Sequence, residues 1–355
     1  MDVNKITNYF EKSFLSPLLM DKEITDISYN GEDFFYLHNY YGRQRVFFEI
    51  SKEVVKDFVR QIANMSEQQF SFSNPILDIS FGKYRFNAVH QSIGKVNNQD
   101  AITFAIRIGS TELHIGRRNG FLPEPVAELI DILVNSRMSI VLGGETGSGK
   151  TELQKYFLTR MKENTRIIII DNVLELDNHS LGDFLDMNVW QADEKTKYSN
   201  IQFLVKNALR SNPDWLIVAE SRGAEMIEVL NSAMTGHPII TTIHALDASS
   251  MPNRMTRMVL MNEKKMSFED VHADITYHFR FYIYLKRRIA DDGKVKRYIS
   301  EIVEYSDNKT PITIYKKDDN KEIYQPLSDS TLNYLTYTKD DISFIDKFIK
   351  KGGEV

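Results

Sequence analysis

The chain contains no cysteine, which excludes disulfides, thiolate zinc sites and a thiol nucleophile. It also has no apolar run near the roughly 18 residues that a membrane-spanning helix needs. Residues 1–20 carry Asp2, Lys5, Glu11 and Lys12 and lack the continuous apolar core of a signal peptide. We therefore expect a cytoplasmic protein in a reducing compartment, whose association with the cytoplasmic membrane is peripheral and runs through partners.

Net charge is small as well. The 355 residues carry a formal net charge of −5, which excludes a global basic field for nucleic acid but not a local basic face. The composition, 42% hydrophobic and 26% charged, is that of an ordinary globular protein. The length is sufficient for two domains with sizeable cores, and no internal repeat stands out.

Residues 1–108 mix short strand-like runs with one clearly helical stretch. The helical stretch, 53–63, places its apolar residues on one face. Strands are expected at 24–28, 34–38, 83–90 and 101–108, with the turn Asn30-Gly31 between the first two. This mixture predicts a smaller N-terminal α+β domain.

Two polar stretches flank the second part of the chain. Residues 109–120 include Arg117 and Arg118 and are expected to form the interdomain linker. Paired arginines in a linker are usually only solvated, but they could also lie over a nucleotide. Residues 306–355 are polar and charged, and we expect them to form a small appendage.

Residues 121–305 alternate between helical and strand-like patterns. Three apolar strands are expected, at 166–171, 215–220 and 238–244. Apolar strands of this kind suit a mostly parallel sheet covered by helices on both faces, so an α/β domain is predicted. The segments 275–289 and 294–304 flank Asp291-Asp292-Gly293, which indicates a hairpin.

The most specific motif is a phosphate-binding loop with the pattern Gly-x-x-x-x-Gly-Lys-[Ser/Thr]. A short apolar strand at 138–142 precedes it and a helix at 151–161 follows it. Glycines allow the tight turn that aims backbone N–H groups at phosphate oxygens, and the helix dipole adds to this attraction. Nucleotide contacts are expected from Gly144, Glu145, Thr146, Gly147, Ser148, Gly149, Lys150, Thr151 and Glu152. Lys150 would reach the β/γ-phosphates, and Thr151 would offer its hydroxyl to Mg²⁺.

Carboxylates follow two of the predicted strands, at the edge where open α/β sheets bind ligands. Asp171 and Glu175 end the first, where they could hold Mg²⁺, although such a carboxylate is more often a helix cap. Glu220 ends the second, and it is placed to orient and polarise an attacking water. Arg222 could neutralise phosphate charge or only pair with a carboxylate.

Two histidines bracket the third predicted strand. His237 precedes it and His244 follows it. The odd spacing of seven puts them on opposite faces of a regular strand, so they are not expected to share one metal. His244 lies at the edge where a sensor of the γ-phosphate would be useful, whereas a lone histidine at a strand end is usually structural.

These motifs, in this order, resemble those of the secretion traffic ATPases of type II secretion, type IV pili and type IV secretion. The phosphate loop is followed by the acidic box 171–175, by Leu-Arg-x-x-Pro-Asp-x-x-x-Val-x-Glu-x-Arg at 209–222, and by Thr-Gly-His-x-x-x-x-Thr-x-His-Ala at 235–245. Further N- and C-terminal patterns extend the resemblance over roughly residues 20–305 and are most similar to the tight-adherence pilus and VirB-type branches.

The resemblance implies a RecA-like fold, a homo-hexameric ring and ATP bound with Mg²⁺ between the two domains. It implies a catalytic role for Glu220, roles for His237 and His244 at the nucleotide, and an arginine from the N-terminal side at the phosphates. Arg107 is the first candidate for that arginine. The implied partners are platform proteins of the inner membrane, with protein or DNA as cargo.

The chain departs from the family pattern at three positions. Asp171-Asn172 replaces Glu-Asp, which removes a charge from the acidic box, Ala219 replaces a glycine, and Glu152 stands where Thr or Ser is common. The altered box favours an alternative, a non-enzymatic assembly subunit that binds ATP with little turnover. The basic residues at 286–288 and 294–297 leave a nucleic-acid translocase as another alternative.

Overall fold

In the computed structural model the chain forms two compact units. Unit 1 comprises Met1–Thr111, Val173–Glu175 and Ile289–Lys296, and unit 2 comprises Glu112–Asn172, Leu176–Arg288 and Arg297–Val355. The structure describes residues 2–110, 113–115, 120–176, 185–193, 196–261, 265–306, 310–318, 321–337 and 345–349. Arg117 and Arg118 of the expected linker lie outside these ranges, and the predicted domain bounds stay predictions.

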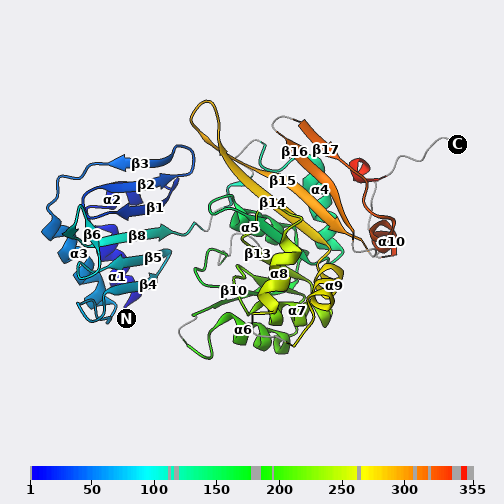
Figure 1. Ribbon diagram of the computed structural model, residues 1–355, viewed down its shortest axis with the longest axis horizontal. Coiled ribbons are helices and arrows are strands. Elements are labelled where there is room, and N and C mark those ends of the chain that lie inside the picture. Colours follow the sequence, from blue (N-terminus) through cyan, green and yellow to red (C-terminus); the bar gives the residue numbers. More distant parts are fainter. Residues whose placement is uncertain are drawn as a thin grey trace. The chain divides into compact units, whose positions relative to one another are not determined.

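Unit 1 contains a six-stranded antiparallel sheet in the order β3-β2-β1-β8-β5-β4 (Figure 1). Its strands are β1 Ile24–Tyr29, β2 Phe34–His38, β3 Gly42–Val46, β4 Ile76–Phe81, β5 Tyr84–Val89 and β8 Thr103–Ile108, and β6 Lys95–Val96 pairs with β7 Gln99–Asp100. Its helices are α1 Val3–Glu11, α2 Ser16–Leu19 and α3 Lys52–Met65. One apolar core lies between the sheet and these helices.

Local sequence explains these elements. The predicted turn is present, because Asn30 Oδ1 accepts hydrogen bonds from Glu32 N and Asp33 N and Gly31 has φ +102°. Helix α3 begins after Ser51, whose hydroxyl accepts from Val54 N. In β5, buried and half-buried residues alternate, as expected for a strand with one covered face.

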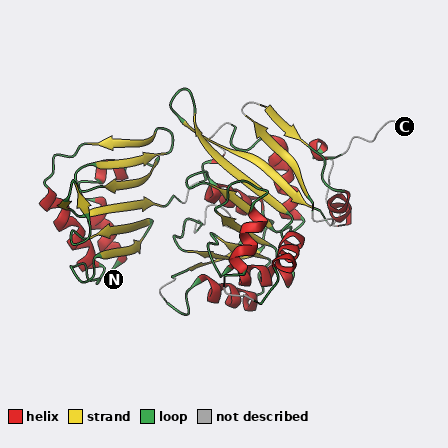
Figure 2. Ribbon diagram, in the orientation of Figure 1, coloured by secondary structure: helices red, strands yellow, loops and turns green. Residues whose placement is uncertain are grey.

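Unit 2 contains a nine-stranded sheet in the order β11-β10-β12-β13-β9-β14-β15-β16-β17. The first six strands in this order are parallel, and β15–β17 are antiparallel (Figure 2). The strands are β9 Ile140–Gly144, β10 Arg166–Asp171, β11 Asp186–Gln191, β12 Trp215–Val218, β13 Ile239–Ile243, β14 Phe281–Ile289, β15 Val295–Tyr305, β16 Pro311–Asp318 and β17 Lys321–Tyr324. The predicted α/β fold is confirmed.

Helices cover both faces of this sheet, with a separate core on each side. One core receives residues from α4 Glu124–Asn135, α5 Lys150–Arg160 and α10 Asp329–Tyr337. The other receives residues from α6 Ile201–Ala208, α7 Met226–Met234, α8 Met251–Val259 and α9 Phe268–His278. In β10, Ile167 and Ile169 join the first core whereas Ile168 and Ile170 join the second. Both faces of the central strands are therefore buried.

One strand prediction was wrong at its start. Residues 275–278, expected to open the strand 275–289, form the last turn of α9, and β14 begins at Phe281. The helix begins after Ser267, whose hydroxyl accepts from Asp270 N at 3.0 Å. The helical spacing of Val271 and Ile275, both buried, continues this helix into the apolar run.

The C-terminal segment adds to the core of unit 2. Ile314, Tyr315 and Leu335 are buried in the same core as α4 and α5. Glu304, which is fully buried, accepts hydrogen bonds from Ser328 N at 3.0 Å and from the Thr331 hydroxyl at 2.6 Å. This carboxylate thus holds the start of α10. Among the described residues, no helix is both long enough and apolar enough to cross a membrane.

Candidate functional site

The phosphate loop connects β9 to α5, as the sequence predicted. Gly144, Gly147 and Gly149 all have positive φ, at +151°, +73° and +101°. A Cβ at position 144 would lie 2.5 Å from Leu285 O, and one at 149 would lie 2.7 Å from the ring of Phe121. The loop therefore needs glycine for both its backbone conformation and its close packing.

Lys150 and His244 meet at one carbonyl of this loop. Lys150 Nζ donates to Gly144 O at 2.8 Å and to Glu145 O at 2.9 Å. His244 Nδ1 lies 3.1 Å from the same Gly144 O. Because β13 and β9 are adjacent parallel strands, His244 and the phosphate loop follow them at the same edge of the sheet.

Glu220 joins this group from the neighbouring strand β12. Its Oε1 lies 3.2 Å from His244 Nε2, and its Oε2 accepts a hydrogen bond from Arg222 Nη2 at 2.6 Å. Oε1 is buried and has no hydrogen-bond partner among the described residues. The structure thus connects four of the predicted catalytic residues, Lys150, His244, Glu220 and Arg222, within one unit.

The charges of this group keep Glu220 ionised. Burial raises the pKa of the Glu220 carboxyl, but the hydrogen bond from Arg222 and the charges of Arg222, His244 and Lys150 outweigh burial, and the pKa is lowered. The pKa of His244 is also lowered, first by burial and then by the charge of Lys150, against the opposing effect of Glu220. A carboxylate and a neutral imidazole therefore face each other at neutral pH.

The position of the His244 proton follows from its contacts. A carbonyl oxygen can only accept, so the neutral ring carries its proton on Nδ1, facing Gly144 O. Nε2 then presents a lone pair to Glu220 Oε1, which is also an acceptor. The two atoms are too close for a molecule between them, but a water molecule beside the pair would donate to both.

Residues not predicted for the site hold Glu220 through the preceding carbonyl. Ala219 O accepts hydrogen bonds from Gln154 Nε2 of α5 at 3.3 Å and from the Thr242 hydroxyl of β13 at 2.8 Å. Gln154 is fully buried, so this contact lies inside the unit. The only sequence signal for Thr242 was its place in the histidine motif, and nothing marked Gln154.

The predicted metal ligands do not form a protein cage. Thr151 is the second residue of α5, and Asp171 Oδ2 accepts from Leu176 N at 3.3 Å. Glu175 Oε1 lies 3.4 Å from Arg107 Nε, and both residues belong to unit 1. No group of three or more His, Cys, Asp or Glu side chains in the described part of the chain could hold a metal ion. The metal roles of all three residues stay predictions.

Glu152 contacts its own unit rather than the phosphate loop. Its Oε1 accepts from the buried Lys155 Nζ at 2.7 Å, and its Oε2 accepts from His114 N at 2.6 Å. The carboxylate thus ties residues 113–115 to α5. Its predicted contact with nucleotide stays a prediction.

The structure does not bring His237 to the other site residues. His237 precedes β13 and lies beside the Thr235 hydroxyl at 3.1 Å, whereas His244 follows the same strand. The five residues of β13 lie between the two histidines, which therefore stand at opposite ends of the strand. Its predicted role at the nucleotide stays a prediction.

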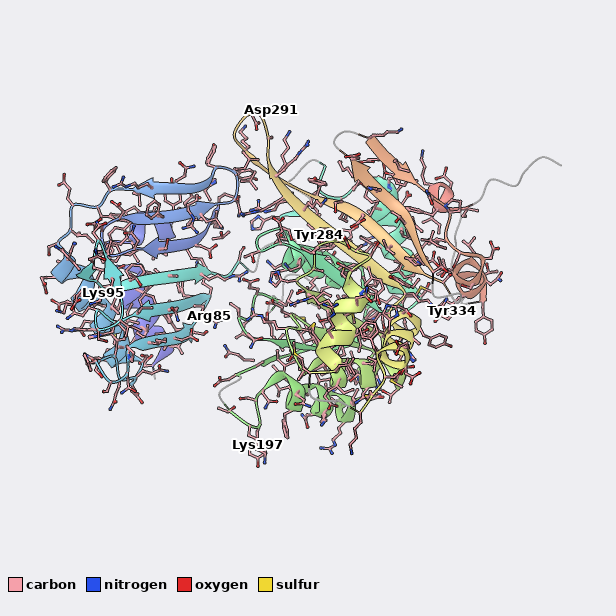
Figure 3. All side chains as sticks on the ribbon, viewed as in Figure 1. Arg85, Lys95, Lys197, Tyr284, Asp291 and Tyr334 are labelled. Carbon is pink, nitrogen blue, oxygen red and sulfur yellow. The ribbon has the colours of Figure 1, made fainter. Side chains whose placement is uncertain are left out.

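Arg107 lies in unit 1, on β8, one residue before the strand ends. Its direct neighbours across the sheet are Asp26 on β1 and Arg85 on β5. These side chains and Arg43 line a pocket of about 210 Å³ on the sheet, and Figure 3 labels Arg85 there. No motif in the sequence marked Arg85 or Arg43. The antiparallel pairing of β5 with β8 is the signal that would have joined Arg85 to Arg107.

Comparison with known proteins matches these features to one family. The sequence model described as Type II/IV secretion system protein (T2SSE) matches residues 105–275, which include the phosphate loop, Glu220 and His244. The chain is 28% identical to an uncharacterised protein of Bacillus anthracis, covering 92% of this chain and 78% of that one. It is 34% identical, over 128 residues, to the type IV secretion system protein VirB11 of Brucella suis, covering 35% of this chain and 36% of that one.

Solved structures show the same fold. The ATPase DotB of Legionella pneumophila superposes with a TM-score of 0.62 and 23% identity, covering 82% of each chain. At this identity the likeness concerns the fold alone. The tight-adherence branch suggested by the sequence stays a prediction. The motifs, their arrangement at one edge of the sheet and the family match agree, and the chain belongs to the type II/IV secretion traffic ATPases.

Proposed function

We propose that the chain hydrolyses ATP in the presence of Mg²⁺ and works as a homo-hexameric motor for pilus assembly or macromolecular transport. Family membership supports ATPase activity in general. The observation that carries the proposal is the continuous set of contacts from Lys150 through Gly144 and His244 to Glu220 and Arg222.

Each member of this set suits one task in phosphoryl transfer, where positioning and electrostatics supply most of the catalysis. Lys150 is a cation held by two carbonyls of the glycine-rich loop and would exchange these carbonyls for phosphate oxygens. Glu220 Oε1, buried and without a hydrogen-bond partner among the described residues, would accept a proton from the attacking water. His244 Nε2 would accept a second hydrogen bond from that water.

Arg222 has two effects on this arrangement. Its hydrogen bond keeps Glu220 ionised, and its own exposed charge would offset negative charge as the phosphate bond breaks. Thr151, Asp171 and Glu175 carry oxygen donors, the kind of ligand that Mg²⁺ prefers, and we propose them as ligands of the ion, which would neutralise phosphate charge. The arginine expected from the N-terminal side, Arg107, is proposed to contribute another cation.

The partners follow from the same family membership. We propose that platform proteins of the inner membrane receive the motion of the ring and that protein or DNA cargo is moved through them. The chain would then work in the cytoplasm, at the membrane surface, and would be held there by these partners.

Replacing Glu220 with glutamine tests the proposal. Glu220→Gln keeps the shape of the side chain but removes the proton acceptor, so ATP binding should persist while turnover falls by about 10²- to 10⁴-fold. Phosphate release by the assembled full-length protein measures turnover, and calorimetry measures binding. Glu269→Gln, an exposed change of the same kind at the start of α9, is the matched control. Substantial turnover in Glu220→Gln would remove Glu220 from its role.

One observation favours a second candidate, a structural subunit that binds ATP with little turnover. Asp171 accepts a backbone N–H from its own loop, and Asn172 stands where a carboxylate was expected. The acidic box would then serve the fold rather than a metal. Steady-state phosphate release by the unmodified ring separates the two candidates, because only the motor sustains turnover at saturating ATP.

A further inference from the structure

The C-terminal part of the sheet reaches the phosphate loop. Strand β14 pairs in parallel with β9, and Leu285 lies opposite Gly144 at the strand's end. Arg297 of the following strand β15 donates from Nε to Gly147 O at 2.6 Å. Arg287 lies close by, since a Cβ at position 147 would be 3.4 Å from its Nη1. All of these contacts lie within unit 2.

Arg297 and Lys150 contact different parts of the loop. Lys150 holds the carbonyls of Gly144 and Glu145, at the start of the loop, whereas Arg297 holds the carbonyl of Gly147 near its middle. A lysine that turns to a phosphate gives up its loop contacts. The Arg297 contact comes from another strand and does not depend on that lysine.

The Gly147 carbonyl determines the direction of a neighbouring N–H. In a planar trans peptide the C=O of Gly147 and the N–H of Ser148 point in opposite directions. Within the loop, Ser148 N has a 3.2 Å contact to Glu145 O. Gly147 has φ +73°, and glycine gives the backbone much conformational freedom to lose. The hydrogen bond from Arg297 to the Gly147 carbonyl therefore orders the Gly147–Ser148 peptide before any ligand binds.

We propose that Arg297 is a positioning residue of the nucleotide site, and that its Nε–H rather than its charge holds the Gly147–Ser148 peptide in the binding conformation. This inference rests on the proposed function of the same site. Because the loop is ordered before the reaction, loss of Arg297 weakens ATP and ADP to the same extent. It raises KM and leaves kcat nearly unchanged.

Three substitutions separate the hydrogen bond from the charge. In Arg297→Gln, the side-chain Nε2 occupies the same place along the chain as the arginine Nε, so the donor stays and the charge is lost. Arg297→Lys keeps the charge but moves the donor one atom further out. Arg297→Met has neither. Loss of one hydrogen bond corresponds to a change in affinity of up to about ten-fold.

The experiment measures Kd for Mg-ATP and Mg-ADP by calorimetry, and KM and kcat by phosphate release, on the full-length protein. Arg297→Met and Arg297→Lys should bind both nucleotides about ten-fold more weakly, with kcat within about two-fold of the unmodified protein. Arg297→Gln should stay within about two-fold in Kd. Lys296→Gln, a change of an exposed residue directly before Arg297 in β15, is the control and should leave Kd unchanged.

Each other outcome overturns the inference in a recognisable way. If Arg297→Gln binds as weakly as Arg297→Met, the charge is responsible. If Arg297→Met binds normally, the contact has no role, and a fall in kcat alone would place Arg297 in the chemical step. If the unmodified protein neither binds nor hydrolyses ATP, the proposed function fails together with the inference. If the unmodified protein hydrolyses ATP and Arg297→Met binds nucleotide equally well, only the inference fails and the proposed function stands.

Discussion

The two large sheets of this protein present their polar side chains in different places. In unit 2 the central strands are covered on both faces, and β9, β12 and β13 are buried throughout. The candidate catalytic side chains therefore come from the turns that follow these strands. In unit 1 only one face is covered, and charged side chains such as Asp26, Arg107 and Arg85 lie within β1, β8 and β5 themselves.

The difference shows how covering a sheet restricts where chemistry is found. A charged side chain in the middle of a doubly covered strand would lose its hydration without a partner, at a high cost in free energy. A half-open sheet carries charges along its whole length on the uncovered face. In the central strands β9, β10, β12 and β13 of unit 2, charged side chains are thus confined to the strand ends, whereas in unit 1 they lie on the uncovered face.

The largest expected effect concerns a strand end. Lys150→Ala removes the cation of the phosphate loop, so binding of Mg-ATP should weaken by more than about 100-fold. Calorimetry on the full-length protein measures the loss. Lys162→Ala, an exposed lysine just beyond α5, is the control. Near-normal ATP binding by Lys150→Ala would show that the glycine-rich turn is not the phosphate site.

The next test concerns the double cover of β10. Ile168 and Ile169 point into different cores, and both are fully buried. Ile168→Ala and Ile169→Ala should each lower the free energy of unfolding by about 2–5 kcal/mol. Urea unfolding followed by tryptophan fluorescence reports this unit, because the two tryptophans, Trp190 and Trp215, both belong to it. A cost below about 1 kcal/mol for either variant would mean that its face is not closely packed.

A smaller effect is expected from His244 as pH changes. Its lowered pKa means that the folded chain binds this proton less readily than the unfolded chain. The full contribution of His244 to the free energy of unfolding is therefore present above the ordinary histidine pKa of about 6.5. This contribution decreases as the pH falls below that value. The charged groups around the ring are Lys150, Glu220 and Arg222.

His244→Gln checks this expectation. It should lose less stability than the unmodified protein between about pH 7.5 and pH 5.5, as measured by urea unfolding. A background loss is expected in both proteins, because burial also lowers the pKa of His90 and His278. Equal losses in the two proteins would show that His244 does not resist protonation.

The smallest effect is expected on the open face of unit 1. Arg85→Gln removes an ion pair with Asp78 whose N–O distance is 3.4 Å and whose members are partly exposed. The free energy of unfolding should change by no more than about 0.5 kcal/mol. Hydrogen exchange of the β5 amides measures it, since the tryptophans lie in the other unit. Phe86→Ala, the next residue on the covered face, should cost about 3–5 kcal/mol.

The sequence predicted those parts of the site that lie in contiguous motifs. The phosphate loop, Glu220 and His244 could be found because each motif combines a strand, a turn and a particular residue within a few positions. The contacts of Arg297 and Gln154 could not, because their partners lie 150 and 65 residues away in the chain. Such contacts depend on the order of strands in the sheet.

Secondary structure, too, could be predicted where a local sequence pattern marks it and not elsewhere. The helix over 53–63 and the strand over 166–171 were predicted because their apolar residues have a clear period or form a short buried run. The strand expected from residue 275 began too early, because a short apolar run fits a buried helix equally well. Strand β11, only half-buried, had no such signal.

The resting position of Lys150 has a consequence for turnover. With two carbonyls of its own loop as partners, this ammonium group has an internal competitor for every phosphate that arrives. Some binding energy would be given up in that exchange, and in the proposed reaction the return of the lysine to its loop carbonyls would ease departure of the spent nucleotide. The proposed ATPase would have to empty its site in every cycle, and such a reversible attachment would favour that.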